Sequence, residues 1–438
     1  MEKETLKTKD IIVSGLALFA VFFGAGNLVL PPYIGINAGK AWVWAWIGFT
    51  LSGSGLTFLT MVAMAKNQGN SGKFGERVGR RFSIILGMIL TLCIGPLVAV
   101  PRTAATTFEV SISPFFSNFN PILFSVIFFG ITLYFAINKS KIVDIIGNYL
   151  TPVLLIILIF IILKGIFTPI EPTTVVGEGQ FSLGFVQGYH TTDPLIPVIM
   201  ASVIIANFKR KGIKSKQRLT TYTIYSALIA TIGLALIYGG LTYVGSKMFP
   251  VVEKGLGRSE LLNTIAYYLL GGYGNLALGI VVALACLTTS IGLTTATGDF
   301  FSKITNNKLK YEYVVIMSVL ISCVLSIIGV DGIMKFSEPV LLIIYPVVIV
   351  LGILNIFDKY IKSDLVYKST IYFTLGVSLL SGIEALGFEN SLLVRLMSNL
   401  PLWRLGFGWI SAALIGLVVA KIICYFLIEQ TSTEEEII

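Results

Sequence analysis

The sequence predicts an all-α integral membrane protein built from two inverted repeats, and three observations support this. The first is composition, since 55% of the 438 residues are hydrophobic and 13% are charged, against roughly 25% charged in soluble domains. The second is the recurrence of apolar stretches of about 20 residues, the length that crosses a bilayer as a helix. The third is a proline-containing apolar segment that occurs twice in the chain.

The duplicated segment reads VDIIGNYLTPVLLII at residues 143–157 and VDGIMKFSEPVLLII at residues 330–344. We interpret it as a duplication rather than as convergence of two Leu- and Ile-rich helices, because the shared letters agree in register. The second copy follows the first at an odd offset of five apolar spans, so the two copies cross the bilayer in opposite directions. Inverted repeats are typical of secondary transporters, which open a central site to each side in turn.

The apolar stretches indicate twelve transmembrane helices, because unpaired backbone groups are costly in lipid. Their centres lie near Val21, Leu51, Gly95, Val126, Leu155, Ile199, Ala230, Val282, Leu320, Val348, Leu375 and Ala413. We expect a first five-helix repeat at residues 1–166 and an external loop at 167–184. The second, inverted repeat is expected at 185–357, and helices 11 and 12 with an acidic cytoplasmic tail at 358–438.

The net charge of +9 is distributed as in a membrane protein rather than as in a nucleic-acid-binding protein. Basic residues gather in alternate loops, with about 22 on one side of the predicted membrane and about seven on the other. This positive-inside bias predicts a multi-pass protein of a bacterial plasma membrane with both termini in the cytoplasm. The partner that it implies is the lipid bilayer, and no nucleic-acid partner is expected.

The first span contains the string FFGAGNLVLPP at residues 22–32, with Gly24, Gly26 and Asn27 near its middle. Glycine lowers helix propensity, so this span is predicted to be broken there. Free backbone groups at membrane depth are tolerated where they line a cavity, so the break indicates a polar ligand site. A close helix-packing face made by the small residues is the alternative.

The sixth span contains GYHTTDPLIP at residues 188–197. Pro194 lacks a backbone donor and disfavours helical geometry at Asp193, so this span is predicted to break as well. Paired broken helices point to a transport site, because the amino ends of half-helices attract carboxylates and the carbonyl ends attract cations. His190, the single histidine of the chain, is expected either to relay a proton or to form a hydrogen bond at the rim.

The eighth span carries a dense hydroxyl cluster in ALACLTTSIGLTTATGDFF at residues 283–301. Thr288 and Thr289, with a kinked backbone carbonyl, offer the neutral oxygens that suit a weakly held Na⁺. The alternative is that these hydroxyls bond back to their own helix and have no ligand.

Two charges of the third span, Arg102 and Glu109, are seven positions apart and so share a helical face. Buried charges in lipid are usually paired. They are predicted to form a structural or gating ion pair, and the alternative is direct contact of Arg102 with the substrate. The sequence contains no convincing nucleophile and base set and no metal-ligand cluster. An enzyme or an organic cofactor is therefore not expected.

Four motifs together resemble the bacterial branched-chain amino acid:cation symporter family. They are FFGAGNLVLPPYIG at 22–35, GPLVAVPRTAATTFEV at 95–110, the Thr-Thr-Asp at 191–193 and ACLTTSIGLTTA at 285–296. The last is also similar to the eighth helix of the wider LeuT-like superfamily. The resemblance implies a LeuT-type bundle of two inverted five-helix repeats plus two C-terminal helices, in which helices 1 and 6 are broken. It further implies import of Leu, Ile and Val with Na⁺.

The same resemblance implies the site residues. The Na⁺ ligands would be the carbonyls of Ala20, Phe23 and Ala285 and the hydroxyls of Thr288 and Thr289. The substrate would meet Gly24, Ala25, Gly26 and Asn27 in the first break and Thr191, Thr192 and Asp193 in the second. The chain departs from the family pattern at Pro194 and at Glu338, and the latter leaves room for a proton in place of Na⁺.

We therefore predict a secondary active symporter that imports branched-chain amino acids with Na⁺ by alternating access. A proton-coupled transporter of small apolar amino acids on the same fold is the alternative, and it would use Glu338, Glu109 or His190. A channel is disfavoured because the breaks lie at mid-membrane and no repeated filter is evident.

Overall fold

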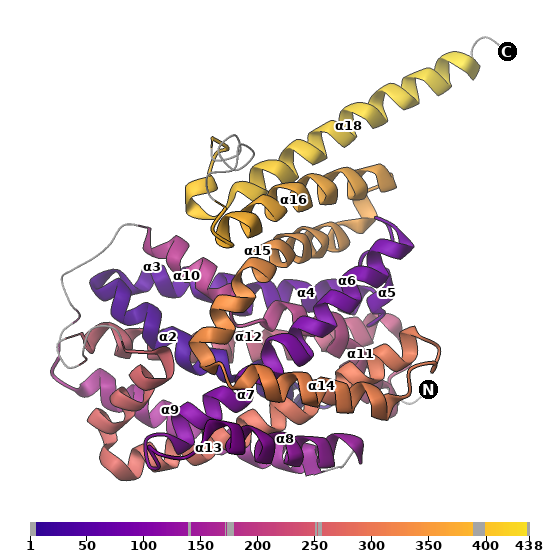
Figure 1. Ribbon diagram of the computed structural model, residues 1–438. Helices are drawn as coiled ribbons and strands as arrows, with labels where there is room; N and C mark the ends of the chain where they lie inside the picture. Colours follow the sequence, from indigo (N-terminus) through magenta and orange to yellow (C-terminus); the bar gives the residue numbers. More distant parts are fainter. Residues whose placement is uncertain are drawn as a thin grey trace.

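The computed structural model describes residues 6–138, 142–170, 172, 179–249, 252, 256–388 and 399–435, and the side chains of these residues except at 142–151 and 427–435. Every regular element in the described ranges is a helix, which confirms the all-α prediction. Most helices gather in one bundle, and α18 (Gly408–Glu435) extends from the edge of this bundle beside α16 (Asp364–Ala385), as Figure 1 shows.

The chain enters the bundle through two short helices that are separated by a break. These are α1 (Thr8–Phe22) and α2 (Ala25–Ala38). At Gly39 the backbone takes a positive φ of 51°, which glycine adopts without steric cost. The turn sends the chain into α3 (Trp42–Thr50), which packs back against α2 and leads through a π-helical turn into α4 (Leu56–Lys66).

The next helices are interrupted at Gly95, where φ is −93° and ψ is −118°. The interruption separates α6 (Arg80–Leu92) from α7 (Ala99–Thr107), because Pro96 removes a helical donor directly after the glycine. A π-helical turn at Phe108–Ile112 follows α7. The chain then passes into α8 (Pro121–Ile137), whose first amides are capped by the side chain of Asn120.

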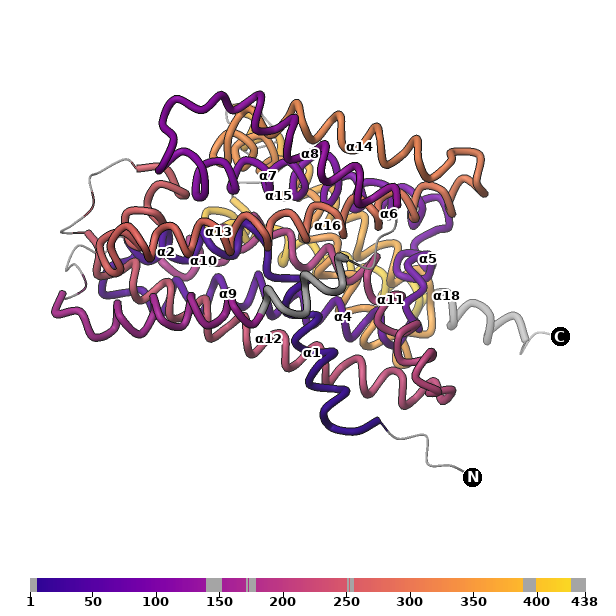
Figure 2. Tube along the Cα trace, turned by 90° about the horizontal axis from the view of Figure 1, so that it is seen from below, coloured from indigo at the N-terminus to yellow at the C-terminus, as the bar shows by residue number. Residues whose placement is uncertain are grey.

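Both copies of the duplicated segment are helical. They lie in α9 (Ile142–Phe167) and α15 (Gly329–Ile356), and each helix has the shared proline in its interior, Pro152 and Pro339. In Figure 2 the described part of α9 runs between α12 and α13, and it contacts both. α15 packs instead against α4 and α16.

The helices between the two copies are α10 (Gln180–Tyr189), α11 (Ile196–Arg210), α12 (Lys216–Lys247), α13 (Arg258–Ile304) and α14 (Tyr311–Ser326). α10 begins inside the stretch 167–184 that was predicted to be a loop. The reason is that Gly179, at a φ of 73°, provides a left-handed start, and Phe185 of the following apolar turns is buried. α13 is kinked at Gly271, where φ is 68°.

Six helices in the described part of the chain are long and apolar enough to cross a membrane, or seven if α10 and α11 count as one bent span. Three further apolar helices are shorter, at Pro121–Ile137, Pro152–Phe167 and Tyr311–Ser326. A multi-pass membrane protein is therefore supported, and the number twelve stays a prediction.

Two helix pairs beside the breaks pack so closely that their backbones touch at glycines. A Cβ atom on Gly184 of α10 would overlap with the carbonyl oxygen of Ala45 on α3, and one on Gly35 of α2 would overlap with that of Thr242 on α12. Small residues allow this approach between membrane helices. The two breaks described below therefore lie beside helices whose positions are fixed at backbone level.

Candidate functional site

The first break is two residues long. Between the last residue of α1 and the first of α2, Phe23 (φ −78°, ψ 91°) and Gly24 (φ −110°, ψ −170°) are extended. The break is shorter than the predicted stretch of residues 24–27, because residues 25–27 form the first turn of α2. The Asn27 amide donates to the Gly24 carbonyl at 3.2 Å. The first amides of a helix have no acceptor within it, so those of Ala25 and Gly26 still offer polar backbone there.

Open space lies beside this break. A Cβ atom built on Gly24 would meet no other atom within 4 Å, whereas one built on Gly26 would lie 3.0 Å from the Arg102 guanidinium carbon. The carbonyl end of α1 and the amide end of α2 flank Gly24 in the chain. The first therefore favours a cation and the second favours an anion.

The second break separates α10 from α11 and bends their axes by 49°. After α10 ends at Tyr189 the chain leaves helical geometry, and Asp193 starts a short 3₁₀ turn that leads into α11. Thr192 has a φ of 64°, in the left-handed region that a β-branched residue rarely adopts. Pro194 occupies the first turn, where its missing donor is not needed.

A buried polar cluster joins the two breaks. The Asn27 amide nitrogen donates to Asp193 Oδ2 at 2.7 Å, to the Phe22 carbonyl at 3.1 Å and, in a short contact, to the Tyr238 hydroxyl. The Tyr238 hydroxyl donates to the same Asp193 oxygen at 3.0 Å. None of Asn27, Asp193 and Tyr238 is more than 1% exposed. The first break, the second break and α12 therefore meet at one carboxylate.

Arg102 of α7 enters the same region. Its guanidinium donates to the His190 carbonyl in a short contact and to the Thr191 carbonyl at 3.1 Å, and the residue is 3% exposed. These are carbonyls of the turn that follows α10, so a positive charge satisfies the end of that half-helix. Since the guanidinium also lies against Gly26, Arg102 stands between the two breaks.

The predicted ion pair between Arg102 and Glu109 is not formed in this structure. Glu109 Oε1 instead accepts a hydrogen bond of 2.8 Å from the amide of Val330, at the start of α15. Seven residues of helix rise about 10 Å, so two side chains on one face at this spacing lie at different depths. The position of Arg102 favours the alternative interpretation, in which it faces the substrate region.

Several buried polar atoms on α2, on α7 and in the turn after α10 have no hydrogen-bond partner in the described part of the protein. They are Asn27 Oδ1, Arg102 Nε, Thr106 Oγ1 and His190 Nδ1. Buried polar groups in folded proteins are normally paired. Buried donors and acceptors of this kind are available to a small polar ligand.

The chain matches a known family over almost its full length. Residues 7–427 match the family described as branched-chain amino acid transport protein. The chain belongs to this family. It is 38% identical to the branched-chain amino acid permease BraB of Bacillus subtilis, over 97% of this chain and 98% of the relative. It is 35% identical to the branched-chain amino acid transport system 2 carrier protein of Pseudomonas aeruginosa, over 95% and 96%. Members named as permeases and carriers make the chain a transporter rather than an enzyme.

Solved transporter structures confirm the LeuT-type fold. The inward-facing conformation of Mhp1 aligns with a TM-score of 0.61 at 14% identity, over 94% of this chain and 90% of that one. A Na⁺-coupled sialic acid symporter gives 0.58 at 13% identity, over 94% and 89%. MhsT in complex with L-phenylalanine gives 0.53 at 14% identity, over 94% and 98%. At these identities the likeness concerns the fold alone.

The predicted Na⁺ ligands lie on two helices. Ala20 and Phe23 are at the carbonyl end of α1, and Ala285, Thr288 and Thr289 are in the interior of α13. α1 packs mainly on α12, whereas α13 packs on α2, α7 and α9. The donor chemistry nevertheless fits Na⁺. Carbonyls in the last turn of a helix lack helical donors, and the Thr288 hydroxyl gives its proton to the Leu284 carbonyl at 2.8 Å, which leaves its lone pairs available.

Tyr238 is the site residue that the sequence analysis missed. It lies in α12, which carries several other tyrosine, threonine and serine hydroxyls, so its place in the sequence does not set it apart. Its full burial is the feature that distinguishes it, and burial depends on how α12 packs against α2.

Proposed function

We propose that the protein is a secondary active symporter that brings Leu, Ile and Val into a bacterial cell together with Na⁺ by alternating access. The observation that supports the proposal is the buried hydrogen bond from Asn27, in the first turn of α2, to Asp193, at the end of the second break. Two of the relatives described above are named as a permease and a carrier for branched-chain amino acids. This supports the same substrate class here.

The polar ends of the two breaks suit the two charges of an amino acid. The amide end of α2, at residues 24–26, would receive the substrate carboxylate. Asp193 and the carbonyls of residues 190–191 would receive the ammonium group. In this structure Arg102 holds those carbonyls, so substrate binding would require the guanidinium to share or leave them.

The proposal includes a twelve-helix topology. α1 with α2 would form one discontinuous membrane helix, and α10 with α11 the other, at matching positions of two inverted repeats. Residues 1–166 and 185–357 would be these repeats, followed by two helices, with both termini in the cytoplasm. The short and bent helices of the structure are compatible with this count, because a span divided by a break appears as two short helices.

Na⁺ would be held by the carbonyls of Ala20, Phe23 and Ala285 and the hydroxyls of Thr288 and Thr289. The ion would supply a positive charge between α1 and α13, and its gradient would drive accumulation. Bound Na⁺ would stabilise the conformation in which oxygens of both helices surround the ion, and so it would shift the population toward that conformation.

Proton coupling is the second candidate, and the buried carboxylate of Asp193 favours it. A carboxylate inside a membrane protein is a frequent proton carrier. In that case the transported amino acid and the binding region would stay the same, and the ion set on α13 would have no part in coupling.

The test is leucine uptake into proteoliposomes under separate Na⁺ and pH gradients, with Thr288→Ala compared to wild type. Thr295→Ala is the matched control, because both hydroxyls donate to the carbonyl four residues earlier at 2.8 Å. We expect uptake to depend on Na⁺, and the dependence to weaken in Thr288→Ala alone. Leucine uptake that a pH gradient drives in Na⁺-free buffer, at the same rate in wild type and in both variants, would show that the coupling ion is the proton and not Na⁺.

A further inference from the structure

A basic cavity lies between the carboxyl end of α4, the short helix α5 (Ser71–Phe74) and the amino end of α12. Its volume is about 690 Å³, within the range of cavities that hold small ligands. Each lining side chain in the described part of the chain is basic, an amide or a hydroxyl, and none is acidic. These residues are Lys66, Asn67, Gln68, Asn70, Lys73, Lys216, Gln217, Thr220 and Thr221. The cavity therefore presents a surplus of positive charge.

The three lysines come from three different elements, and two of them have no partner. Lys66, at the end of α4, donates to the Ile356 carbonyl at 2.7 Å. The ammonium groups of Lys73 and Lys216 form no hydrogen bond or ion pair within the described ranges. Like charges that line one space repel each other, and a bound anion removes that repulsion.

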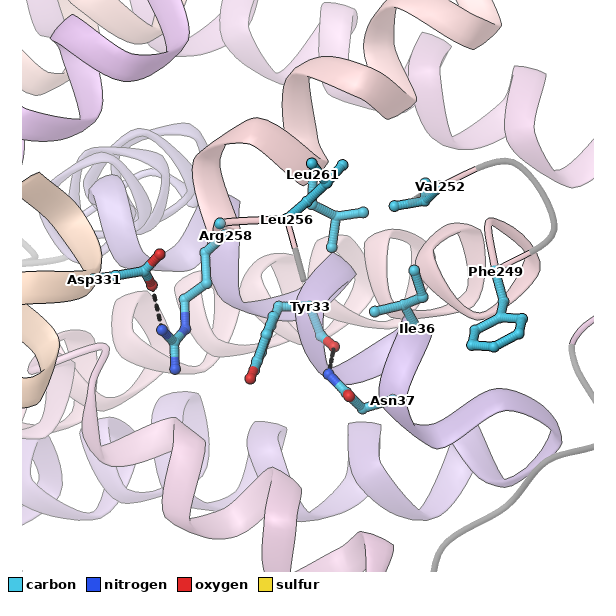
Figure 3. A pocket seen from close by; sticks show the side chains of 10 residues that line it. Tyr33, Ile36, Asn37, Phe249, Val252, Leu256, Arg258, Leu261 and Asp331 are labelled. Atoms are coloured by element: carbon cyan, nitrogen blue, oxygen red, sulfur yellow. Dashed lines mark hydrogen bonds and ion pairs between the residues drawn. The ribbon is translucent and has the colours of Figure 1, made fainter. Parts of the chain in front are cut away.

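Another cavity, where α2 ends and α13 and α15 begin, has the partner that the basic cavity lacks. Figure 3 shows Arg258 and Asp331 side by side on its wall, and the two form an ion pair. A carboxylate already neutralises that guanidinium, so this cavity offers little to an anion. The lysines of the basic cavity line it without any carboxylate among the described residues.

The amino end of α12 adds neutral donors to the basic cavity. α12 is 32 residues long, and the first amides of a helix carry a partial positive charge because they have no acceptor within it. The Ser215 hydroxyl caps the amide of Arg218, which leaves the amides of Lys216 and Gln217 for a ligand. Phosphate groups bind at helix ends of this kind.

We propose that the basic cavity binds a phosphate-bearing anion, either the headgroup of an anionic phospholipid or a soluble phosphorylated molecule. Lys73 and Lys216 contact the phosphate oxygens with their ammonium groups. The Gln217 amide and the Thr221 hydroxyl, which have no partner in the part of the chain that the structure describes, donate to the same oxygens. A phosphate monoester has about two negative charges and three strong acceptor oxygens, which suits two free cations with neutral donors beside them.

A bound phosphate joins elements that are distant in the sequence. At the wall of the basic cavity, the Gln68 amide donates to the Thr220 hydroxyl at 2.9 Å, and this hydroxyl donates to the Ala65 carbonyl at 3.1 Å. These bonds tie the end of α4 to the start of α12. A phosphate held by Lys73 on one side and Lys216 on the other adds a charged contact between the same parts of the chain. Binding is therefore expected to stabilise the folded protein.

The test removes the two free charges together, in Lys73→Gln/Lys216→Gln. This double variant leaves the Lys66 contact in place, so the fold should persist. The matched control is Lys209→Gln/Lys214→Gln, which removes two exposed lysines at the end of α11 and just after it, outside the basic cavity. It lowers the net charge of the protein by the same amount.

A third variant, Gln217→Glu, keeps every lysine and places a carboxylate on the wall of the basic cavity. Gln217 is exposed, so the change leaves the packing of α12 unaltered. Since a carboxylate repels phosphate, this variant tests the site without removing a cation.

Binding is measured on the purified full-length protein with two probes. Isothermal titration calorimetry with pyrophosphate, on protein in phosphatidylcholine nanodiscs, reports on a soluble ligand. Native mass spectrometry of protein released from nanodiscs made of equal masses of phosphatidylcholine and cardiolipin counts bound cardiolipin and reports on a lipid. Thermal denaturation with and without each probe gives the change in stability.

We expect wild type and the Lys209→Gln/Lys214→Gln control to bind at least one probe and to be stabilised by it. Lys73→Gln/Lys216→Gln should bind that probe at least about tenfold more weakly, and Gln217→Glu should weaken it as well. Binding of pyrophosphate alone would identify a soluble ligand, and binding of cardiolipin alone a lipid. The proposal is overturned if wild type binds neither probe, or if the two double variants bind equally well.

Discussion

The two chain breaks differ in how their free backbone groups are satisfied. At the first break, Phe23 and Gly24 are extended, Gly24 faces open space, and the contact with the rest of the site is made by the side chain of Asn27. At the second break, the carbonyls of His190 and Thr191 are held by a buried guanidinium. At the first break, Asn27 holds the carbonyls of Phe22 and Gly24 from within the same chain segment, whereas at the second break a charged side chain of another helix holds the carbonyls.

The difference shows that the site is asymmetric in charge. Unpaired carbonyls in a buried region are costly, and Arg102 removes that cost at the second break. The first break needs no such charge, because only two residues separate the end of α1 at Phe22 from the start of α2 at Ala25. The Asn27 side chain also donates to the Phe22 carbonyl. We therefore expect substrate recognition to respond most to substitution of Arg102 at the second break and least to substitutions that change only the backbone conformation.

The largest effect is expected from Arg102→Met. It leaves the carbonyls of His190 and Thr191 without donors, at a cost of about 1 to 3 kcal/mol for each group. Leucine uptake should fall by about tenfold or more, together with the thermal stability of the purified protein. Arg102→Lys should recover part of both, because an ammonium still donates to a carbonyl. Uptake by Arg102→Met at the wild-type rate would show that the second break does not depend on a charged side chain to hold its carbonyls.

A smaller effect is expected from Asn27→Ala, which separates the two breaks. Asp193 keeps the Tyr238 hydroxyl and loses the amide. Loss of a hydrogen bond to a charged group costs about 1.5 to 3 kcal/mol, so kcat/KM for leucine should fall by at least about tenfold. Tyr238→Phe is the comparison and should cost less, since it leaves the contact between the breaks in place. Equal losses in the two variants would mean that the contact with α12 matters as much as the contact between the breaks.

The open space at the first break is tested by comparing Gly24→Ala with Gly26→Ala. The added methyl group meets no atom at Gly24 and meets the Arg102 guanidinium at Gly26. Gly24→Ala should therefore keep its thermal stability while KM for leucine rises a few-fold, because the methyl group occupies space meant for substrate. Gly26→Ala should lower stability. An unchanged KM in Gly24→Ala would place the substrate elsewhere.

The smallest effect is expected at Thr192, whose left-handed backbone costs about 1 to 2 kcal/mol for a residue with a side chain. Thr192→Gly removes this cost, but it adds conformational freedom to the unfolded chain and removes the hydroxyl that donates to the Thr191 carbonyl at 2.5 Å. Thermal denaturation should therefore show a change of no more than about 1 kcal/mol. Thr191→Gly is the control and should destabilise the protein, because the Thr191 hydroxyl donates to the Gly188 carbonyl at 2.8 Å.

Local sequence chemistry predicted interruptions of the helical chain near Gly24 and Asp193, and that each interruption divides one membrane helix stays a prediction. Glycines at Gly24 and Gly26 and a proline after Asp193 determine backbone geometry within a few residues, and the structure places its two breaks there. The length of the first break was overestimated, because the helix restarts directly after Gly24. Once helix-terminal amides are exposed, the chain gains nothing from further unwinding.

Contacts between distant helices were harder to predict. Arg102 and Glu109 share a helical face, which suggested an ion pair, but residues on one face can lie at different heights along the helix. Each of the two side chains instead bonds to a backbone group from another part of the chain. Tyr238 was missed for the same reason, because its partners are 45 and 211 positions away in the chain. The placement of α12 and α7 around the breaks decides these contacts, and no short motif encodes it.

The glycine contacts between helices limit how the protein can move. Because backbone touches backbone at Gly35 against α12 and at Gly184 against α3, these helices cannot slide or rotate past each other without a collision that no side-chain rotamer relieves. α2 must travel with α12, and α10 with α3. Any rearrangement that exposes the site is thus restricted to rigid-body displacement of these pairs, with slippage confined to interfaces such as that of Gly298 with Tyr311, where a side chain can yield.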